Sequence, residues 1–147
     1  MHLLLKITFL VSQGDRLASA SEDTTVKIWQ EYKPGNEEGI VTENNDSTWK
    51  CVCTLAGFHD RAVYDIAWCS QTGLIATGGG DDCIRVFKED TVNVSDAKNA
   101  PTFSLEITQN AAHEQDVNCV AWNPVEKGLI ASGGDEGDVK LWQIKSN

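Results

Sequence analysis

The stretch LIASGGDEGDVKLW, residues 129–142, decides the fold because the chain contains three versions of it. The others are LIATGGGDDCIRVF, residues 74–87, and RLASASEDTTVKIW, residues 16–29. Each version has a short apolar run, a cluster of small and acidic residues, and an alternating run that ends in an aromatic residue. Self-similarity at a long, nearly fixed period indicates a repeat architecture, in which one repeat cannot bury its apolar face alone.

Each copy ends in an aromatic residue, with Ser or Thr ten positions before it and an acid six positions before it. These residues are Trp29, Ser19 and Asp23 in the first copy, Phe87, Thr77 and Asp81 in the second, and Trp142, Ser132 and Glu136 in the third. The similarity extends upstream, where HDRAVYDIAW (59–68) matches HEQDVNCVAW (113–122). The repeat therefore includes a histidine in its second and third copies, His59 and His113.

Each unit has the pattern of short strands separated by turns. Residues 63–68 and 117–122 alternate as strands do, and two further short strands follow in each unit. Residues 50–56 and 102–107 supply fourth strands, while the polar segments 31–49 and 89–101 are expected to be surface loops between third and fourth strands. Four antiparallel strands per unit, stacked radially, make a blade of a β-propeller. We therefore predict an all-β fold without a helix.

The recurring side chains have complementary hydrogen-bonding groups. An indole N–H donates, a hydroxyl and an imidazole both donate and accept, and a carboxylate accepts, so in series they satisfy one another and rigidify a buried site. The predicted structural networks are His59, Thr77 and Asp81; His113, Ser132, Glu136 and Trp142; and Ser19, Asp23 and Trp29. The alternative is a catalytic Ser-His-Asp set. The repetition and the position of the serines inside predicted strands disfavour it, so no catalytic residue is predicted.

The clusters of glycine and acid do not match a phosphate or calcium loop. Residues 78–83, GGGDDC, are not GxGxxG, and no Lys-Ser/Thr follows the glycines. Residues 135–138, DEGD, lack the glycine and glutamate positions of an EF-hand. Tight turns that need positive φ fit all three copies, so neither a metal site nor a cofactor is predicted.

Composition favours a globular protein that binds other proteins. The chain has 147 residues, of which 41% are hydrophobic and 23% charged, and a net charge of -10. Such an acidic surface repels phosphate backbones and anionic lipid, so we expect no nucleic-acid or membrane binding and a preference for basic partners. The apolar start, MHLLLKITFLV, is not expected to be a secretion signal, because Lys6 interrupts it and the repeat already begins at Leu17.

The cysteines are scattered and odd in number, which favours a reducing compartment over a disulfide framework. They are Cys51, Cys53, Cys69, Cys83 and Cys119. Because positions i and i+2 of a strand share one face, Cys51 and Cys53 could lie side by side. They are then either packed or surface thiols without a chemical role, or a redox-active or metal-binding pair.

These residues resemble the WD-repeat family, which has a His-led loop, an aromatic residue ending the third strand, and an acid in the turn before that strand. The chain departs from the family pattern at the places that read Gly57-Phe58-His59, Ala111-Ala112-His113, Gln30, Lys88, Gln143 and Glu136. The resemblance implies that residues 1–147 are a partial β-propeller, about three blades of a seven-bladed ring. Its blade repeats fall at approximately 14–56, 57–107 and 111–144, and residues 1–13 match poorly.

A narrower resemblance, from about Gly14 to Ile144, is to the cytosolic iron–sulfur protein assembly branch of this family. It is carried by EYKPGNEEG (31–39), STWKCVCTLAGFHDRAVYDIAWCSQTG (47–73), GDDCIRVFKED (80–90) and QDVNCVAWNP (115–124). It implies the C-terminal portion of a non-enzymatic scaffold that helps deliver iron–sulfur clusters to extramitochondrial apoproteins. Implied partners are a small adaptor, a helical-repeat subunit and client apoproteins, with the Wilms tumour protein as a further candidate. The implied location is the cytoplasm, with the nucleus as second candidate, and chromosome partition is an implied process.

Two other functions stay open. One is a generic WD-repeat adaptor, such as a ubiquitin-ligase substrate receptor or a transcription-factor modulator; receptors of that kind often carry Trp-Asp-x-Arg after a blade, where this chain reads WQEY, FKED and WQIK. The other is an enzyme or direct cluster carrier that uses the Cys and His residues. Partner contacts are predicted in the loops that enter first strands and beside the acidic turns, with ordinary solvated loop charge as the alternative. The predicted contact residues are Asp60, Arg61, Asp82, Glu114, Asp116 and Asp135.

Overall fold

The computed structural model describes residues 15–90 and 100–145, which form ten strands and no helix. The strands are β1 (Arg16–Ala20), β2 (Val26–Tyr32), β3 (Thr48–Leu55), β4 (Val63–Trp68), β5 (Ile75–Gly79), β6 (Ile84–Glu89), β7 (Phe103–Gln109), β8 (Val117–Trp122), β9 (Leu129–Gly134) and β10 (Val139–Gln143). The all-β class predicted from the repeat is confirmed. Within these two ranges no helix is long and apolar enough to cross a bilayer.

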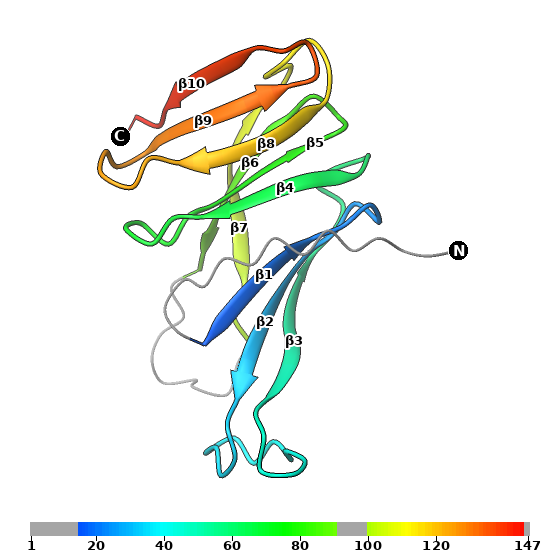
Figure 1. The fold of residues 1–147 in the computed structure, drawn as a ribbon, viewed down its shortest axis with the longest axis vertical. Coiled ribbons are helices and arrows are strands. Elements are labelled where there is room, and N and C mark those ends of the chain that lie inside the picture. Colours follow the sequence, from blue (N-terminus) through cyan, green and yellow to red (C-terminus); the bar gives the residue numbers. More distant parts are fainter. Residues whose placement is uncertain (1–14, 91–99, 146–147) are drawn as a thin grey trace.

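The strands form three antiparallel sheets in which sequence neighbours pair. The first sheet is β1-β2-β3, the middle sheet β4-β5-β6-β7, and the last sheet β8-β9-β10. Figure 1 shows the sheets following one another in chain order as adjacent blades. This is the arrangement of a partial β-propeller. The mismatch predicted for residues 1–13 falls outside the described residues, as does most of the predicted loop 89–101.

The opening stretch folds as β9, a tight turn and β10. Gly137 has a φ of +89° in that turn, and the aligned residues of the other two copies, Thr24 and Asp82, have φ of +73° and +60°. The turn in the last sheet is closed by the Gly137 amide, which donates to the Gly134 carbonyl at 3.0 Å. The recurring acidic segment is therefore a turn with one left-handed residue at a fixed position, which glycine adopts at the lowest cost.

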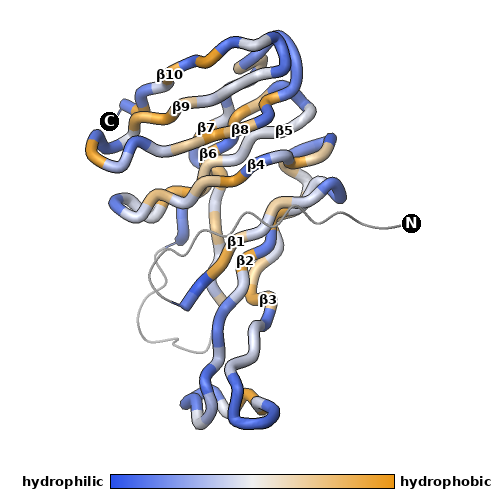
Figure 2. Tube along the Cα trace, in the orientation of Figure 1, coloured by the Kyte–Doolittle hydropathy of each residue, from blue (hydrophilic) through white to orange (hydrophobic). Residues whose placement is uncertain are grey.

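The apolar core lies between the sheets. One cluster joins the first and middle sheets and includes Ile28, Ile66 and Phe87. A second joins the middle and last sheets and includes Val86 and Ile130. The middle sheet is thus covered on both faces, and β5 is buried along its whole length, whereas a sheet with one open face shows alternating burial. Figure 2 shows apolar residues along the strands and polar residues in the connecting turns.

The last sheet ends at an edge strand, β10, with exposed apolar side chains. In β10 every second residue is exposed, and Val139 and Leu141 are 76% and 68% exposed. No fourth strand follows β10 within residues 100–145. Such an apolar edge is a surface on which another strand can pair.

Regular bulges interrupt the pairing at equivalent places in different sheets. Val52 is the extra residue where β3 pairs with β2, because Ile28 is opposite Cys53 and Trp29 is opposite Cys51. Ile28 and Trp29 point to opposite faces of β2, so the bulge separates the faces of the two cysteines. Cys53 packs against the core cluster while Cys51 is exposed. The bulge thus gives the two neighbouring thiols different surroundings, one packed and one exposed, which alternation alone does not predict.

Candidate functional site

The last sheet holds a buried chain of four polar side chains. The Trp142 indole Nε1 donates to Ser132 Oγ at 2.8 Å, and Ser132 Oγ lies 2.7 Å from His113 Nε2. On the other side of the ring, His113 Nδ1 contacts Glu136 Oε1. Only 1% of His113 and 2% of Ser132 is exposed. Because the indole is a donor only, Ser132 accepts from it and has its own hydroxyl proton free for His113.

Glu136 reaches the network although it is one methylene longer than Asp. Its Oε1 contacts His113, and Lys140 Nζ lies 3.8 Å from the same oxygen while donating to the Ala112 carbonyl at 3.0 Å. Its second oxygen, Oε2, is buried without a hydrogen-bond partner. The longer side chain therefore keeps the histidine contact through one of its two carboxylate oxygens.

The middle sheet has a shorter network that contains an arginine. His59 Nε2 lies 2.8 Å from Thr77 Oγ1, and His59 Nδ1 lies 3.0 Å from Asp81 Oδ1. Arg85 Nη1 lies 2.6 Å from Asp81 Oδ2 and 2.7 Å from His59 Nδ1. Phe87 replaces the tryptophan, so Thr77 has no indole N–H to accept, and its hydroxyl donates to the Arg85 carbonyl at 3.4 Å. Sequence reasoning missed Arg85, which ties the acid into the network from the following strand.

The buried groups of the middle network have shifted pKa values. Burial lowers the pKa of His59, although the neighbouring Asp81 carboxylate opposes the shift. Burial alone would raise the pKa of Asp81, but the charges and hydrogen bonds of His59 and Arg85 outweigh it and hold that pKa below its usual range. At neutral pH the structure therefore favours a neutral imidazole beside an ionised carboxylate, and the histidine charge that helps to lower the pKa of Asp81 arises only at acid pH.

Phe87, which replaces the tryptophan of the other copies, packs in an aromatic pair. Phe87 packs edge-to-face against Phe58, with ring centroids 5.0 Å apart and planes at 76°. Such pairs contribute roughly 0.5–1.5 kcal/mol beyond the area they bury. Phe58 and Phe87 both depart from the family pattern, and the two departures contact each other.

The first sheet contains only part of the predicted set. Trp29 Nε1 donates to Ser19 Oγ at 3.0 Å. Asp23 does not join them: its Oδ1 accepts from the Thr25 amide at 2.9 Å and from the Thr25 hydroxyl at 2.7 Å, at an exposed position. The structure thus places Asp23 in a local turn, where the adjacent threonine satisfies its carboxylate.

A glycine two residues before the acid makes room for the histidine. A Cβ on Gly134 would collide with the His113 ring and the Glu136 carboxylate. The aligned Gly79 has the Ala62 carbonyl at 2.7 Å and His59 Nδ1 at 3.1 Å from where a Cβ would stand. In the first copy the aligned residue is Ser21, whose hydroxyl accepts from the Asp23 amide at 3.1 Å. This glycine is a sequence signal for a histidine network that sequence reasoning did not use.

The six predicted contact residues lie at one end of the sheets. In Figure 1 the loops that enter β4 and β8 and the turns that follow β5 and β9 gather at the same end. Asp116 and Asp135 are linked there, because the Asp135 amide donates to the Asp116 carbonyl at 3.1 Å. Arg61 Nη1 donates to the Gly80 carbonyl at 3.0 Å, and the Ala112 amide donates to the Asp82 carbonyl at 2.8 Å. Asp60 and Glu114 are exposed.

Two further residues of this end come from the bulges of the first strands. Tyr64 is the extra residue of β4 and Asn118 that of β8. A hydrogen bond to Asp116 raises the pKa of the Tyr64 phenol, and Asn118 Nδ2 donates to Asp135 Oδ1. Alternation alone does not reveal these residues, because the bulge changes the direction of the side chain. We name this set the acidic end: Asp60, Arg61, Tyr64, Asp82, Glu114, Asp116, Asn118 and Asp135.

The network residues are poorly placed for catalysis. Ser132 is buried, and both Trp142 and His113 occupy its hydroxyl, so a substrate has no approach to the oxygen. All five cysteines are free thiols. Within residues 15–90 and 100–145, no group of three or more His, Cys, Asp or Glu side chains is arranged to hold a metal ion.

Comparison with protein families gives a match to one repeat family. The model described as WD domain, G-beta repeat, matches residues 6–30, 49–88 and 104–143. The second match runs from β3 to β6 and the third from β7 to β10. These two sequence repeats therefore begin with the last strand of one sheet and continue into the next, which joins neighbouring sheets through the chain.

Curated relatives carry one recurrent name. The probable cytosolic iron-sulfur protein assembly protein Ciao1 of Aedes aegypti is 57% identical over 132 residues, which are 90% of this chain and 38% of that protein. The protein of that name in Rattus norvegicus is 58% identical over 115 residues, or 78% and 33% of the two chains. The human one is 56% identical over the same coverage. The chain thus spans between a third and two fifths of the length of these relatives.

A solved structure shows the same fold at low identity. It is a chain in the crystal structure of the Chaetomium thermophilum polycomb repressive complex 2, with a TM-score of 0.66 and 24% identity. The match covers 90% of this chain and 25% of that one. At this identity the likeness supports the arrangement of the sheets alone.

Proposed function

The chain belongs to the WD domain, G-beta repeat family, and from that premise we propose that it is a non-enzymatic protein-interaction scaffold in cytosolic iron–sulfur protein assembly. The observation that carries the proposal is the identity of 57% to a relative named for that process, over 90% of this chain. The buried networks support it, because they use the repeat's His, Ser and acidic side chains for rigidity and leave exposed loops for binding.

The acidic end is the proposed contact surface. Five of its side chains are carboxylates, one is Arg61, and the whole chain has a net charge of -10. Opposite charges speed encounter and orient partners, so the partner surface is expected to be basic. The proposed partners are the small adaptor and helical-repeat subunit of the assembly complex and its client apoproteins, in the cytoplasm. In this proposal the iron–sulfur cluster is cargo carried by other components.

Rigidity is the structural basis of the proposed role. His59 lies in the loop before β4 and is fixed to Thr77 of β5 and to Asp81 in the turn after it. His113 is fixed in the same way before β8. The loops that display the acidic end are therefore pre-ordered, and a partner does not have to supply the free energy of ordering them.

A charge reversal tests this surface. The double variant Arg61→Glu with Asp116→Lys leaves net charge unchanged and is expected to reduce recovery of the small adaptor at least several-fold in affinity purification from cytosol. The matched control is Lys33→Glu with Glu37→Lys, two exposed residues in the loop between β2 and β3. Unchanged recovery with the first pair would place the contact elsewhere, and recovery of no assembly protein by the unaltered chain would contradict the proposed function.

A further inference from the structure

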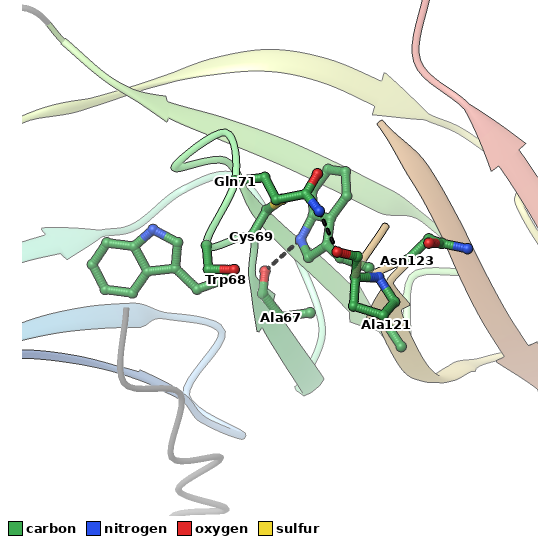
Figure 3. Close-up of a pocket in the computed structure, with 9 residues that line it drawn as sticks. Ala67, Trp68, Cys69, Gln71, Ala121 and Asn123 are labelled. Carbon is green, nitrogen blue, oxygen red and sulfur yellow. Dashed lines mark hydrogen bonds between the residues drawn. The ribbon is translucent and has the colours of Figure 1, made fainter. Parts of the chain in front are cut away.

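A pocket lies between the middle and last sheets, at the end opposite the acidic end (Figure 3). Its walls are residues 67–71, where β4 ends in a turn, and residues 121–124, where β8 ends in the equivalent turn. These are matching positions of two successive repeats. Both walls belong to sheets that already pack on each other through a shared core cluster, so the pocket does not depend on additional strands.

Two hydrogen bonds between the repeats join the two walls of the pocket. The Trp122 indole Nε1 donates to the Ala67 carbonyl at 2.9 Å, and Gln71 Nε2 donates to the Pro124 carbonyl. The equivalent Trp68 indole instead donates within its own turn, to Gly73 at 3.1 Å. The Trp122 indole therefore links the last sheet to the middle sheet and forms part of the pocket wall. A preformed site binds with a smaller entropic cost.

The chemistry of the lining selects an uncharged group. None of the 9 lining residues is charged, although 23% of the chain is. Cys69 contributes a thiol that is 3% exposed and behaves as a small hydrophobe. A charged group placed here would lose its hydration without an opposite charge to replace it. The pocket has a volume of about 240 Å³, below the roughly 300–1,000 Å³ of small-molecule and cofactor sites, and that size suits one side chain.

We propose that this pocket receives one aliphatic side chain, of leucine size, from an extended segment of a partner protein. Within the pocket, Gln71 Nε2 already donates to Pro124 and Asn123 Oδ1 already accepts from the amides of residues 125 and 126. The other polar atom of each amide, Gln71 Oε1 and Asn123 Nδ2, supplies a neutral acceptor and a neutral donor for the partner's backbone on either side of that residue. Anchoring by one buried side chain in a preformed pocket is the usual form of an interface hot spot. The proposal rests on the scaffold function, and adds a second, apolar contact at the end opposite the acidic one.

The test uses N-acetyl-leucinamide as the probe on the full chain, followed by NMR. Saturable shifts of the Trp122 indole N–H resonance are expected, with a dissociation constant of about 1–10 mM for so small a ligand. N-acetyl-aspartamide and N-acetyl-lysinamide should produce no saturable shift there. Ala121→Leu, which fills the pocket from an exposed position, should abolish the effect, and Ala56→Leu, an exposed residue after β3, should preserve it.

A second variant keeps the proposal testable if Ala121→Leu disturbs folding. Gln71→Ala removes one bridging hydrogen bond and should weaken leucinamide binding about 2- to 10-fold. Shifts that do not saturate, or equal binding of the charged amides, would overturn the pocket assignment.

Affinity purification separates this proposal from the proposed function. Ala121→Leu should lose one assembly protein that the unaltered chain recovers. If leucinamide binds but Ala121→Leu recovers every partner, the assignment to a partner protein is refuted while the scaffold function stands.

Discussion

Replacing Ser132 with alanine should destabilise the last sheet more than any other single hydroxyl deletion in the networks. Ser132 Oγ accepts from Trp142 Nε1 at 2.8 Å and lies 2.7 Å from His113 Nε2. Alanine leaves both nitrogens without their partner. A buried donor or acceptor left unsatisfied costs about 1–3 kcal/mol. The His113 side chain is fully buried, while Trp142 is half-buried and can recover water, so we expect a loss of about 2–4 kcal/mol.

The matched comparison is Ser19→Ala in the first sheet. Ser19 is equally buried, but among residues 15–90 and 100–145 its hydroxyl has one hydrogen bond, from the half-buried Trp29, so the expected loss is about 1 kcal/mol. Ser132→Thr keeps the hydroxyl, as Thr77 does in the middle sheet, and should cost less than about 1 kcal/mol. Urea unfolding followed by tryptophan fluorescence measures all three variants. If Ser132→Ala and Ser19→Ala lower the free energy of unfolding equally, the reasoning is refuted, because it attributes the larger loss at Ser132 to its second, buried hydrogen bond with His113.

Three further outcomes are expected. Thr24→Gly should raise the free energy of unfolding by about 1 kcal/mol, because Thr24 has a φ of +73°; a lower urea midpoint would contradict this. Acidification should destabilise the middle sheet in two windows. Because folding lowers the pKa of His59, stability should fall as pH drops below about 6.5; because it lowers the pKa of Asp81, a second loss should begin below about pH 4. Urea midpoints against pH measure both, and Arg85→Gln should reduce the second loss. Anaerobic reconstitution with iron and sulfide should leave the purified chain without iron–sulfur absorbance, and a stable chromophore would favour the cluster-carrier alternative.

The sequence predicted the strands and turns well because local signals specify them. Alternation in residues 63–68 and 117–122 gave β4 and β8, and the recurring acid marked a turn whose left-handed residue is Thr24, Asp82 or Gly137. The sequence did not predict the bulges. A bulge depends on pairing with a neighbouring strand, so the opposed faces of Cys51 and Cys53 and the contacts of Tyr64 followed only from the register.

The candidate site was predictable where the same residues recur in several copies. It was not predictable where one copy departs from the pattern and another residue makes up for the change. His113, Ser132 and Trp142 recur at fixed spacing, and the structure brings them together. Arg85 and Phe58 are peculiar to the middle copy, and their contacts with Asp81 and Phe87 arise because that copy lacks the indole. A repeat pattern describes what the copies share, whereas the partner of a departure from it lies on another strand or loop and is found only in three dimensions.

The two proposed contact surfaces follow from the direction of the strands. β4 and β8 both run from a His-led loop to a tryptophan at the strand's end, so these two repeats place their acidic loops at one end and the Trp68 and Trp122 indoles at the other. At the first end, both histidines are hydrogen-bonded in buried networks, while carboxylates stay exposed, which suits basic partners. At the second end, the Trp122 indole N–H donates to the Ala67 carbonyl of the middle sheet, and the apolar ring faces the pocket. Because the same repeat builds both ends, the two proposed contacts, a basic partner at one end and an apolar side chain at the other, would not compete for the same surface.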